Sequence, residues 1–340
     1  MTTTPRRATL VQVAQLAGVD KAIVSRVLNG DPTLRVKDDT RRRVESAIAQ
    51  LDYVPNYAAR QMRTARSDTY GLVIPDFSNP VIARIISGAQ DEAALHGRLI
   101  TVVSEGLRIG GKPGFLRLLT QNRIDGLLIA GDSVSGEAYG ALRSSEIPWL
   151  FVNRQDPDHT RYVVLDDYRG ARVAVEYLIG LGHRSIGHIA GPDGIDTADR
   201  RRRGYEDALT NAPDMKPAIE VPGGYSAEGG YAATATLLRS PELPTALFVA
   251  NIVSAVGSIR AILDAGLRIP EDISVIALHD HALAAHLAPT LSVVQMPLEE
   301  LGATAVRLLH SAQRDDVVTE QVSEPIVLIP RQSTAPPPHR

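Results

Sequence analysis

From Tyr70 onward, short apolar runs alternate with amphipathic stretches, and this alternation limits the possible fold more than any other feature of the chain. An apolar run over Tyr70–Ile74 is followed by a helical pattern near Val81–His96 and by a second run over Leu99–Val103. Later runs of the same character are Gly126–Ala130, Trp149–Val152, Tyr162–Leu165, Ser185–Ala190, Ala246–Ala250 and Ile273–Leu278. Strand–helix alternation at this spacing predicts parallel, doubly wound sheets, with enough units for two lobes.

This alternating body, residues 67–340, does not restart after a new linker. We therefore expect the chain to cross between the two lobes near residues 166, 296 and 325. In open α/β sheets, ligands bind beyond the carboxyl ends of the strands. Polar residues that directly follow the strands are therefore the candidates for a binding site between the lobes.

Charge divides the chain at about the point where the alternation begins. Up to Arg66 there are 12 basic and 6 acidic residues, a net charge of +6. The rest holds the other 24 of the 36 basic and 33 of the 39 acidic residues, a net charge of −9. Because Lys and Arg neutralise phosphates in the sequence-independent part of nucleic-acid binding, this distribution indicates that only the basic head meets a polyanion.

Composition excludes several other classes of protein. At 340 residues the chain is long enough for two to three domains. The absence of cysteine excludes disulfides and thiolate chemistry, and the nine histidines lack metal-ligand spacing, so we expect neither a metal nor a cofactor. No run approaches about 18 apolar residues, which argues against a membrane span. Met1–Val13 lacks the apolar stretch of a secretory signal, so we expect a cytoplasmic protein.

The basic head, residues 1–55, contains a helix-turn-helix pattern. Thr9 and Gln12 have the spacing of a capping box, which predicts a helix over about 10–16, and Gly18 suits the left-handed turn after it. A second helix is expected over about 21–28 and an amphipathic third over 38–51. The outer face of the second helix would offer Lys21, Ala22, Ser25 and Arg26 to a major groove. The alternative is a small helical hairpin that packs on another domain.

The runs TLVQVAQLAGVDKAIVSRVLNG and TRRRVESAIAQLDYVPNYAARQMRT resemble the head and hinge of the lactose-repressor (LacI/GalR) family. The resemblance continues through the body to about residue 332. It implies an all-α head and a periplasmic-binding-protein-like body of two doubly wound lobes. It also implies a nucleoid-associated transcriptional repressor that binds a palindromic operator as a homodimer under the control of a sugar, sugar acid or related effector.

The resemblance assigns DNA contacts to the head and to a hinge, residues 56–66. Arg26 suits a bidentate guanine contact, and Met62 stands where the family has a leucine that wedges into the central base step. The full set of implied DNA-binding residues is Lys21, Ala22, Ser25, Arg26, Asn29, Asn56, Ala59 and Met62.

Strand ends and the resemblance together give a set of effector-binding residues in the cleft. Arg201 is expected to clamp the effector, because a guanidinium fork suits a carboxylate or vicinal hydroxyls. For each polar residue at a strand end, the alternative is that it caps a helix or lies in a solvated loop. The candidates are Asn79, Asn153, Arg154, Thr197, Arg201, Tyr225, Asn251, His279 and Asp280.

Two positions depart from the family pattern. Ile252 and His279 replace carboxylates that commonly accept sugar hydroxyls. With Arg154, Arg201 and His279, the pocket is expected to be positive, which favours an anionic or partly apolar effector. Protonation of His279 would then raise the affinity for an anion as the pH falls from about 8 to 6.

An enzyme is the main competing class. The body lacks a phosphate-binding Gly-x-x-x-x-Gly-Lys-Ser/Thr loop, a strand-linked Gly-x-Gly-x-x-Gly and a Gly-x-Ser-x-Gly elbow, so we expect no catalytic residues. A ligand-binding protein without a DNA function would not need the basic head. An activator of the same architecture stays open, because the sign of regulation depends on where the operator lies relative to the promoter.

Overall fold

The computed structural model describes residues 8–28, 31, 33–53, 66–121, 123–131, 134, 136–156, 158–313 and 316–338. The chain forms two compact units, residues 1–66 and 67–340, called here the head and the body. None of the helices within the described ranges is long and apolar enough to cross a membrane.

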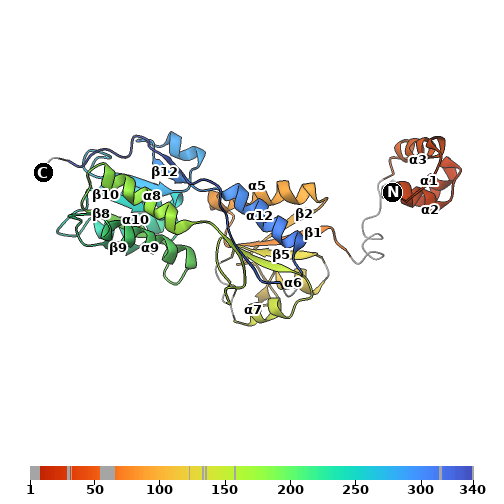
Figure 1. Cartoon of the computed structure of the whole chain (residues 1–340), viewed down its shortest axis with the longest axis horizontal. Helices are drawn as coiled ribbons and strands as arrows, with labels where there is room; N and C mark the ends of the chain where they lie inside the picture. Colours follow the sequence, from red (N-terminus) through yellow and green to blue (C-terminus); the bar gives the residue numbers. More distant parts are fainter. Residues whose placement is uncertain are drawn as a thin grey trace, which may run out of the picture. The chain divides into compact units, whose positions relative to one another are not determined.

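Within its described residues, the head contains the helices α1 (Leu10–Ala17), α2 (Lys21–Leu28) and α3 (Asp38–Gln50) (Figure 1). The capping box is present, because the Thr9 and Gln12 side chains each accept a hydrogen bond from the other residue's backbone N–H. Gly18 ends α1 with a φ of 64°, a left-handed conformation that favours glycine. The apolar faces meet in one core of Val13, Ala14, Ala17, Val24, Val27, Val44 and Ala47. The predicted helix-turn-helix head is confirmed.

A six-stranded sheet organises each lobe of the body. The first has the order β13-β7-β6-β5-β1-β2 and is entirely parallel. Its strands are β1 (Thr69–Ile74), β2 (Leu99–Ser104), β5 (Gly126–Ile129), β6 (Trp149–Val152), β7 (Arg161–Val164) and β13 (Val318–Gln321). An antiparallel hairpin of β3 (Arg108–Ile109) and β4 (Lys112–Pro113) accompanies this lobe and was not expected from the sequence.

The second sheet has the order β14-β12-β11-β10-β8-β9. It is parallel except for the edge strand β14, which runs antiparallel to β12. Its strands are β8 (Ile186–Ala190), β9 (Ile219–Pro222), β10 (Ala246–Val249), β11 (Ser274–Leu278), β12 (Ser292–Gln295) and β14 (Val327–Ile329). The chain changes sheets after β7, after β12 and after β13, so the two lobes exchange segments. Two doubly wound lobes are thus confirmed.

Helices cover both sheets (Figure 1). The first lobe carries α5 (Pro80–Leu95), α6 (Leu116–Thr120), α7 (Gly136–Arg143) and α12 (Leu298–Ser311). The second carries α8 (Asp167–Gly180), α9 (Asp196–Thr210), α10 (Ala227–Leu237), α11 (Ile252–Asp264) and the short 3-10 helix η1 (Ala282–His286).

Glycines let the helices of the body approach each other closely. A Cβ on Gly88 of α5 would lie 1.8 Å from the carbonyl oxygen of Glu299, and one on Gly302 of α12 would lie 2.1 Å from that of Ile85. No side chain fits at such distances, so the α5–α12 contact depends on bare backbone. The same kind of contact joins α10 to α11 through Gly230 and Gly257.

Candidate DNA-reading helix and effector pocket

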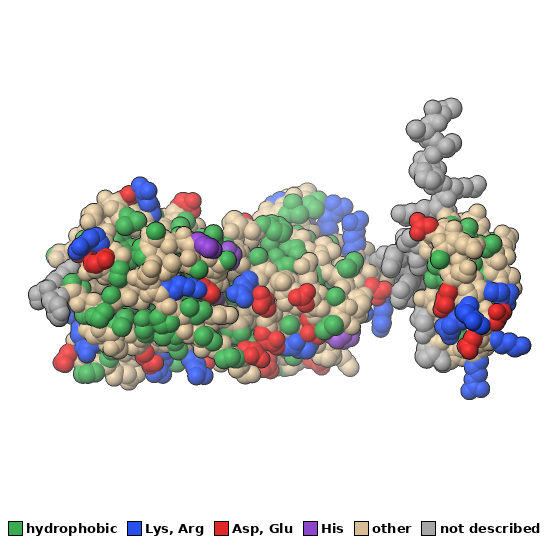
Figure 2. All heavy atoms as spheres, turned by 90° about the horizontal axis from the view of Figure 1, so that it is seen from above, with side chains coloured by type: hydrophobic (Ala, Val, Ile, Leu, Met, Phe, Trp, Pro, Cys, Tyr) green, Lys and Arg blue, Asp and Glu red, His purple; other side chains and the backbone are tan. Residues whose placement is uncertain are grey.

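The outer face of α2 carries the head residues predicted to read DNA. Lys21, Ala22 and Arg26 are exposed and Ser25 is half-buried, while Val24 and Val27 point into the core. On the face drawn in Figure 2, acidic and basic side chains are interspersed over the body, and basic side chains also project from the head. The other predicted DNA contacts, Asn29, Asn56, Ala59 and Met62, lie outside the described residues.

Two residues after α2 hold the Arg26 side chain in place. The Arg26 Nε donates to Asp31 Oδ2 at 2.7 Å, and its Nη2 donates to Thr33 Oγ1 at 3.0 Å. Hydrogen bonds from Thr33 and from Arg26 lower the pKa of Asp31 to about 2, so this carboxylate is ionised. Sequence reasoning missed Asp31 and Thr33, although an aspartate five residues after a basic side chain on a helix was a usable signal.

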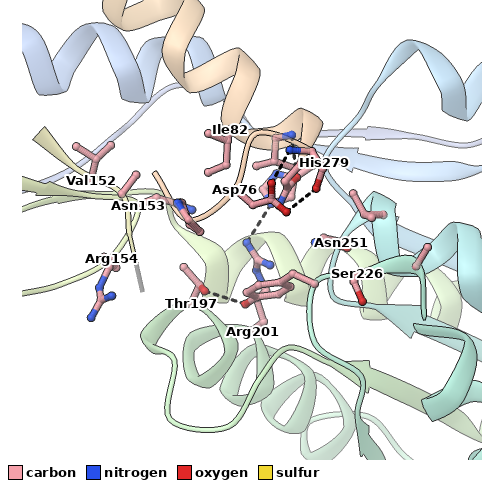
Figure 3. A pocket seen from close by; sticks show the side chains of 18 of the residues that line it. Asp76, Ile82, Val152, Asn153, Arg154, Thr197, Arg201, Ser226, Asn251 and His279 are labelled. Atoms are coloured by element: carbon pink, nitrogen blue, oxygen red, sulfur yellow. Dashed lines mark hydrogen bonds between the residues drawn. The ribbon is translucent and has the colours of Figure 1, made fainter. Parts of the chain in front are cut away.

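A pocket of about 460 Å³ lies where the strand ends of the two lobes face each other. This volume lies within the range of small-molecule sites. The first lobe contributes residues after β1, β5 and β6, and the second lobe residues after β8, β9, β10 and β11 (Figure 3). Its lining consists of Pro75, Asp76, Ser78, Asn79, Val81, Ile82, Ala130, Val152, Asn153, Arg154, Thr197, Arg201, Tyr225, Ser226, Ala227, Glu228, Asn251, Val253 and His279.

Every effector-binding residue predicted from the sequence lines this pocket except Asp280. The Asp280 carboxylate instead accepts a hydrogen bond from Arg331 Nη2 at 2.9 Å, and its carbonyl oxygen accepts one from Arg84 Nη1 at 3.3 Å. Two neighbouring residues that follow one strand point to different sides, so only His279 reaches the pocket. Ile252 is buried in α11 outside the lining, where its neighbour Val253 takes part.

Capping and pocket lining coincide at two of these residues. Asn79 caps α5 by accepting from Val81 N at 3.0 Å, and Asn251 caps α11 by accepting from Ser254 N at 2.7 Å. The side chains of Asn79 and Asn251 therefore both cap a helix and line the pocket. Across the pocket, the hydroxyls of Thr197 and Tyr225 share a hydrogen bond of 2.8 Å.

A buried charge cluster lies directly behind the pocket. The fully buried Asp167 accepts from Arg200 Nη2 at 2.7 Å and from Arg201 Nε at 2.8 Å. Arg200 is also paired with Asp196, whose carboxylate accepts from the backbone N–H of Gln155 in the first lobe at 3.0 Å. Burial by itself raises the pKa of Asp167, but the two guanidiniums lower it below its ordinary value. Asp167 therefore balances much of the positive charge beside the pocket.

Most of the N–H donors of Arg201 are already bonded to other groups of the protein. Besides the bond to Asp167, its Nη1 donates to the Ala250 carbonyl oxygen at 2.9 Å and its Nη2 lies 3.0 Å from Nε2 of His279 (Figure 3). Its side chain is only 3% exposed. Few donors of Arg201 are therefore available for the role expected from the sequence, which is to bind an effector carboxylate.

The expectation that His279 adds positive charge to the pocket is wrong. Complete burial, followed by the charge of Arg201, lowers the pKa of His279 to about 3. The imidazole is therefore neutral throughout the pH range from 8 to 6 in which it was expected to titrate. Asp76 and Glu228, which also line the pocket, add negative charge, so the predicted positive pocket is not present.

Sequence reasoning missed Asp167 and Arg200 as parts of this site. Asp167 starts α8, directly after the chain leaves the first sheet, and its side chain is hidden from the pocket. An aspartate at a helix start normally interacts with the helix N-terminus, so nothing in the sequence singled it out. Among the described residues, no group of His, Asp and Glu could hold a metal ion.

Comparison with known proteins gives matches to both units. Residues 9–56 match the family described as bacterial regulatory proteins, lacI family, and residues 175–334 match the periplasmic binding protein-like domain. The HTH-type transcriptional repressor PurR of Edwardsiella ictaluri is 32% identical over 328 residues, which cover 94% of this chain and 95% of that protein.

Solved structures agree with these matches along nearly the whole chain. The lac repressor dimer bound to operator and the anti-inducer ONPF is 30% identical, with a TM-score of 0.82, and the match covers 97% of this chain and 100% of that one. The complex of the transcriptional regulator CelR with cellobiose is 29% identical, with a TM-score of 0.68, and covers 96% and 100%. Identity above 30% over almost the full length shows that the chain belongs to the lacI family of bacterial regulatory proteins.

Proposed function

We propose that this regulator is a transcriptional repressor that binds a two-fold symmetric operator as a homodimer and responds to a small molecule in the pocket between its lobes. It acts in the cytoplasm, at the nucleoid, and binds ligands without converting them. The observation that carries the proposal is that one chain has both an exposed basic face on α2 and a small-molecule-sized pocket between the lobes of its body. The lac repressor structure that covers 97% of this chain is itself a dimer on operator DNA.

The two activities would be linked through residues 56–66, which we propose as the hinge. Asn56, Ala59 and Met62 would contact the minor groove there, with Met62 as an apolar wedge. The chain changes sheets three times between the lobes, so a ligand that draws the strand ends together would move the first lobe, which follows the hinge directly. In this way, occupancy of the pocket would alter the affinity for DNA.

Arg26→Ala is expected to reduce operator affinity by ~1–3 kcal/mol and to relax discrimination between operator and random duplex. The reason is that Arg26 is the exposed guanidinium of α2, and the bonds to Asp31 and Thr33 leave its outer edge suited to a guanine. Fluorescence anisotropy with both duplexes at one salt concentration measures the two affinities.

Arg42→Ala is the matched control, because it removes the same charge from the exposed side of α3. It should weaken binding to both duplexes in parallel, as expected of a phosphate contact. Asp31→Ala, which leaves Arg26 in place without its partner, should lose part of the discrimination. If Arg26→Ala lowers the affinity for the operator and for the random duplex by the same factor, Arg26 does not read bases.

A further inference from the structure

Two buried polar atoms in the wall of the pocket have no hydrogen-bond partner within the described part of the chain. They are Nδ1 of His279 and Oδ1 of Asn153. His279 follows β11 in the second lobe and Asn153 follows β6 in the first, so the two atoms belong to opposite walls. An unpaired buried polar group destabilises the protein, and a ligand that presents a matching donor or acceptor would remove that penalty.

The surroundings of His279 decide which of its ring nitrogens carries the proton. Nε2 lies 3.0 Å from Nη2 of Arg201, and a guanidinium can only donate. Nε2 must therefore accept, so in the neutral ring the proton is on Nδ1, the unpartnered nitrogen. Arg201 cannot turn away easily, because its Nε is bonded to Asp167 and its Nη1 to the carbonyl oxygen of Ala250.

The surroundings of the His279 ring keep it neutral, and the pocket lining contains charges of both signs. Arg201 and Arg84 oppose a second proton on His279, whereas Asp167 favours one. Burial has the largest effect, the arginines add to it, and together they lower the pKa of His279 to about 3. The lining of the pocket also includes the acidic residues Asp76 and Glu228 and the basic residues Arg154 and Arg201, the last of which is paired with Asp167. A ligand with a net charge of either sign would thus meet a like charge.

We propose that the pocket takes an uncharged effector that presents a hydrogen-bond acceptor to the Nδ1–H of His279 and a donor to Oδ1 of Asn153. Arg201 and Asp167 are positioning residues in this scheme, because they hold the proton on Nδ1 through Nε2. A carbonyl, ether or hydroxyl oxygen, or an unprotonated ring nitrogen, fits the His279 side. The scheme depends on the proposed function only in calling the ligand an effector.

The state of His279 can be measured without any ligand. Nitrogen-15 spectra of the full chain with labelled histidine give the tautomer of each ring, and His279→Asn identifies the His279 signals by their loss. His281→Asn is the matched control two residues away and should remove a different set. We expect His279 to carry its proton on Nδ1 and not to titrate between about pH 5.5 and 8. A proton on Nε2, or titration in that range, would overturn the proposal.

Cellobiose and cellobiouronate (glucuronosyl-β-1,4-glucose) form a probe pair that differs at one position, where a hydroxymethyl group is replaced by a carboxylate. The shift in Tm of the full chain should be larger for cellobiose, with the same size at pH 6 and pH 8. His279→Leu, which removes the Nδ1–H donor and puts no other polar group in its place, should weaken binding of the uncharged probe about tenfold or more. His279→Asn keeps an N–H group near the Nδ1 position and should weaken binding of the uncharged probe less. A larger shift for cellobiouronate, growing as the pH falls, would contradict the scheme while leaving operator binding untouched.

Discussion

Asp167→Asn is expected to lower the free energy of unfolding of the body by ~3–5 kcal/mol, the usual cost of breaking a buried ion pair from one side. The side chain of Asp167 is fully buried, and those of Arg200 and Arg201 are 8% and 3% exposed. Asparagine has almost the same shape, so the change removes charge rather than volume. Arg201 would then hold a buried positive charge without a carboxylate beside it. Urea unfolding followed by far-UV circular dichroism at neutral pH measures the loss.

Glu176→Gln is the matched control for this substitution. Glu176 pairs with Arg172 one turn away on α8, but the two side chains are 49% and 37% exposed. Exposed pairs of this kind contribute about 0–1 kcal/mol. Equal losses for the two variants would show that the cluster behind the pocket is not electrostatically buried, and the argument for a neutral His279 would fail with it.

Gly88→Ala is expected to lower the free energy of unfolding by ~3 kcal/mol, at the upper end of the range for an overpacked contact. In an ordinary helix interior the same change stabilises by about 0.5–1 kcal/mol, because alanine loses less backbone entropy. Here the added Cβ would lie 1.8 Å from the carbonyl oxygen of Glu299. Backbone cannot rotate away as a side chain can, so α5 and α12 must move apart. Thermal unfolding of the purified variant measures the effect.

Gly140→Ala tests whether the loss comes from the helix contact. Gly140 lies within α7, and nothing lies within 4 Å of the position that its Cβ would take. This variant should therefore be as stable as the parent or slightly more so. A Gly88→Ala protein with an unchanged Tm would mean that the two helices are not packed as described.

Local signals in the sequence were sufficient to predict most of the fold. The capping box at Thr9 and Gln12 begins α1 where expected, because capping depends only on residues three apart. The strand at Trp149–Val152 has the expected bounds, since a fully buried parallel strand is a continuous apolar run. The antiparallel edge strand β14 and the hairpin of β3 and β4 were not expected, because β14 is an apolar run of only three residues and β3 and β4 have two residues each.

The chemistry of the pocket was harder to predict than its location. The rule that ligands bind at strand ends places Asn153, Thr197 and His279 around one cavity. The charge of His279, however, depends on contacts with Arg201 and Asp167, which are far away in sequence. Burial and partner geometry arise only when the lobes fold, so counting basic residues predicted a positive pocket that the structure does not have.

Selection of binding sites from a pool of random duplexes tests the central claim most directly. The full chain is equilibrated with the pool near physiological salt, and bound duplexes are sequenced over several rounds. A homodimeric repressor with a reading helix on each head should enrich one sequence with two-fold symmetry, and Arg26→Ala should fail to enrich it. Enrichment of no sequence, or of the same sequence by parent and Arg26→Ala proteins, would contradict the account.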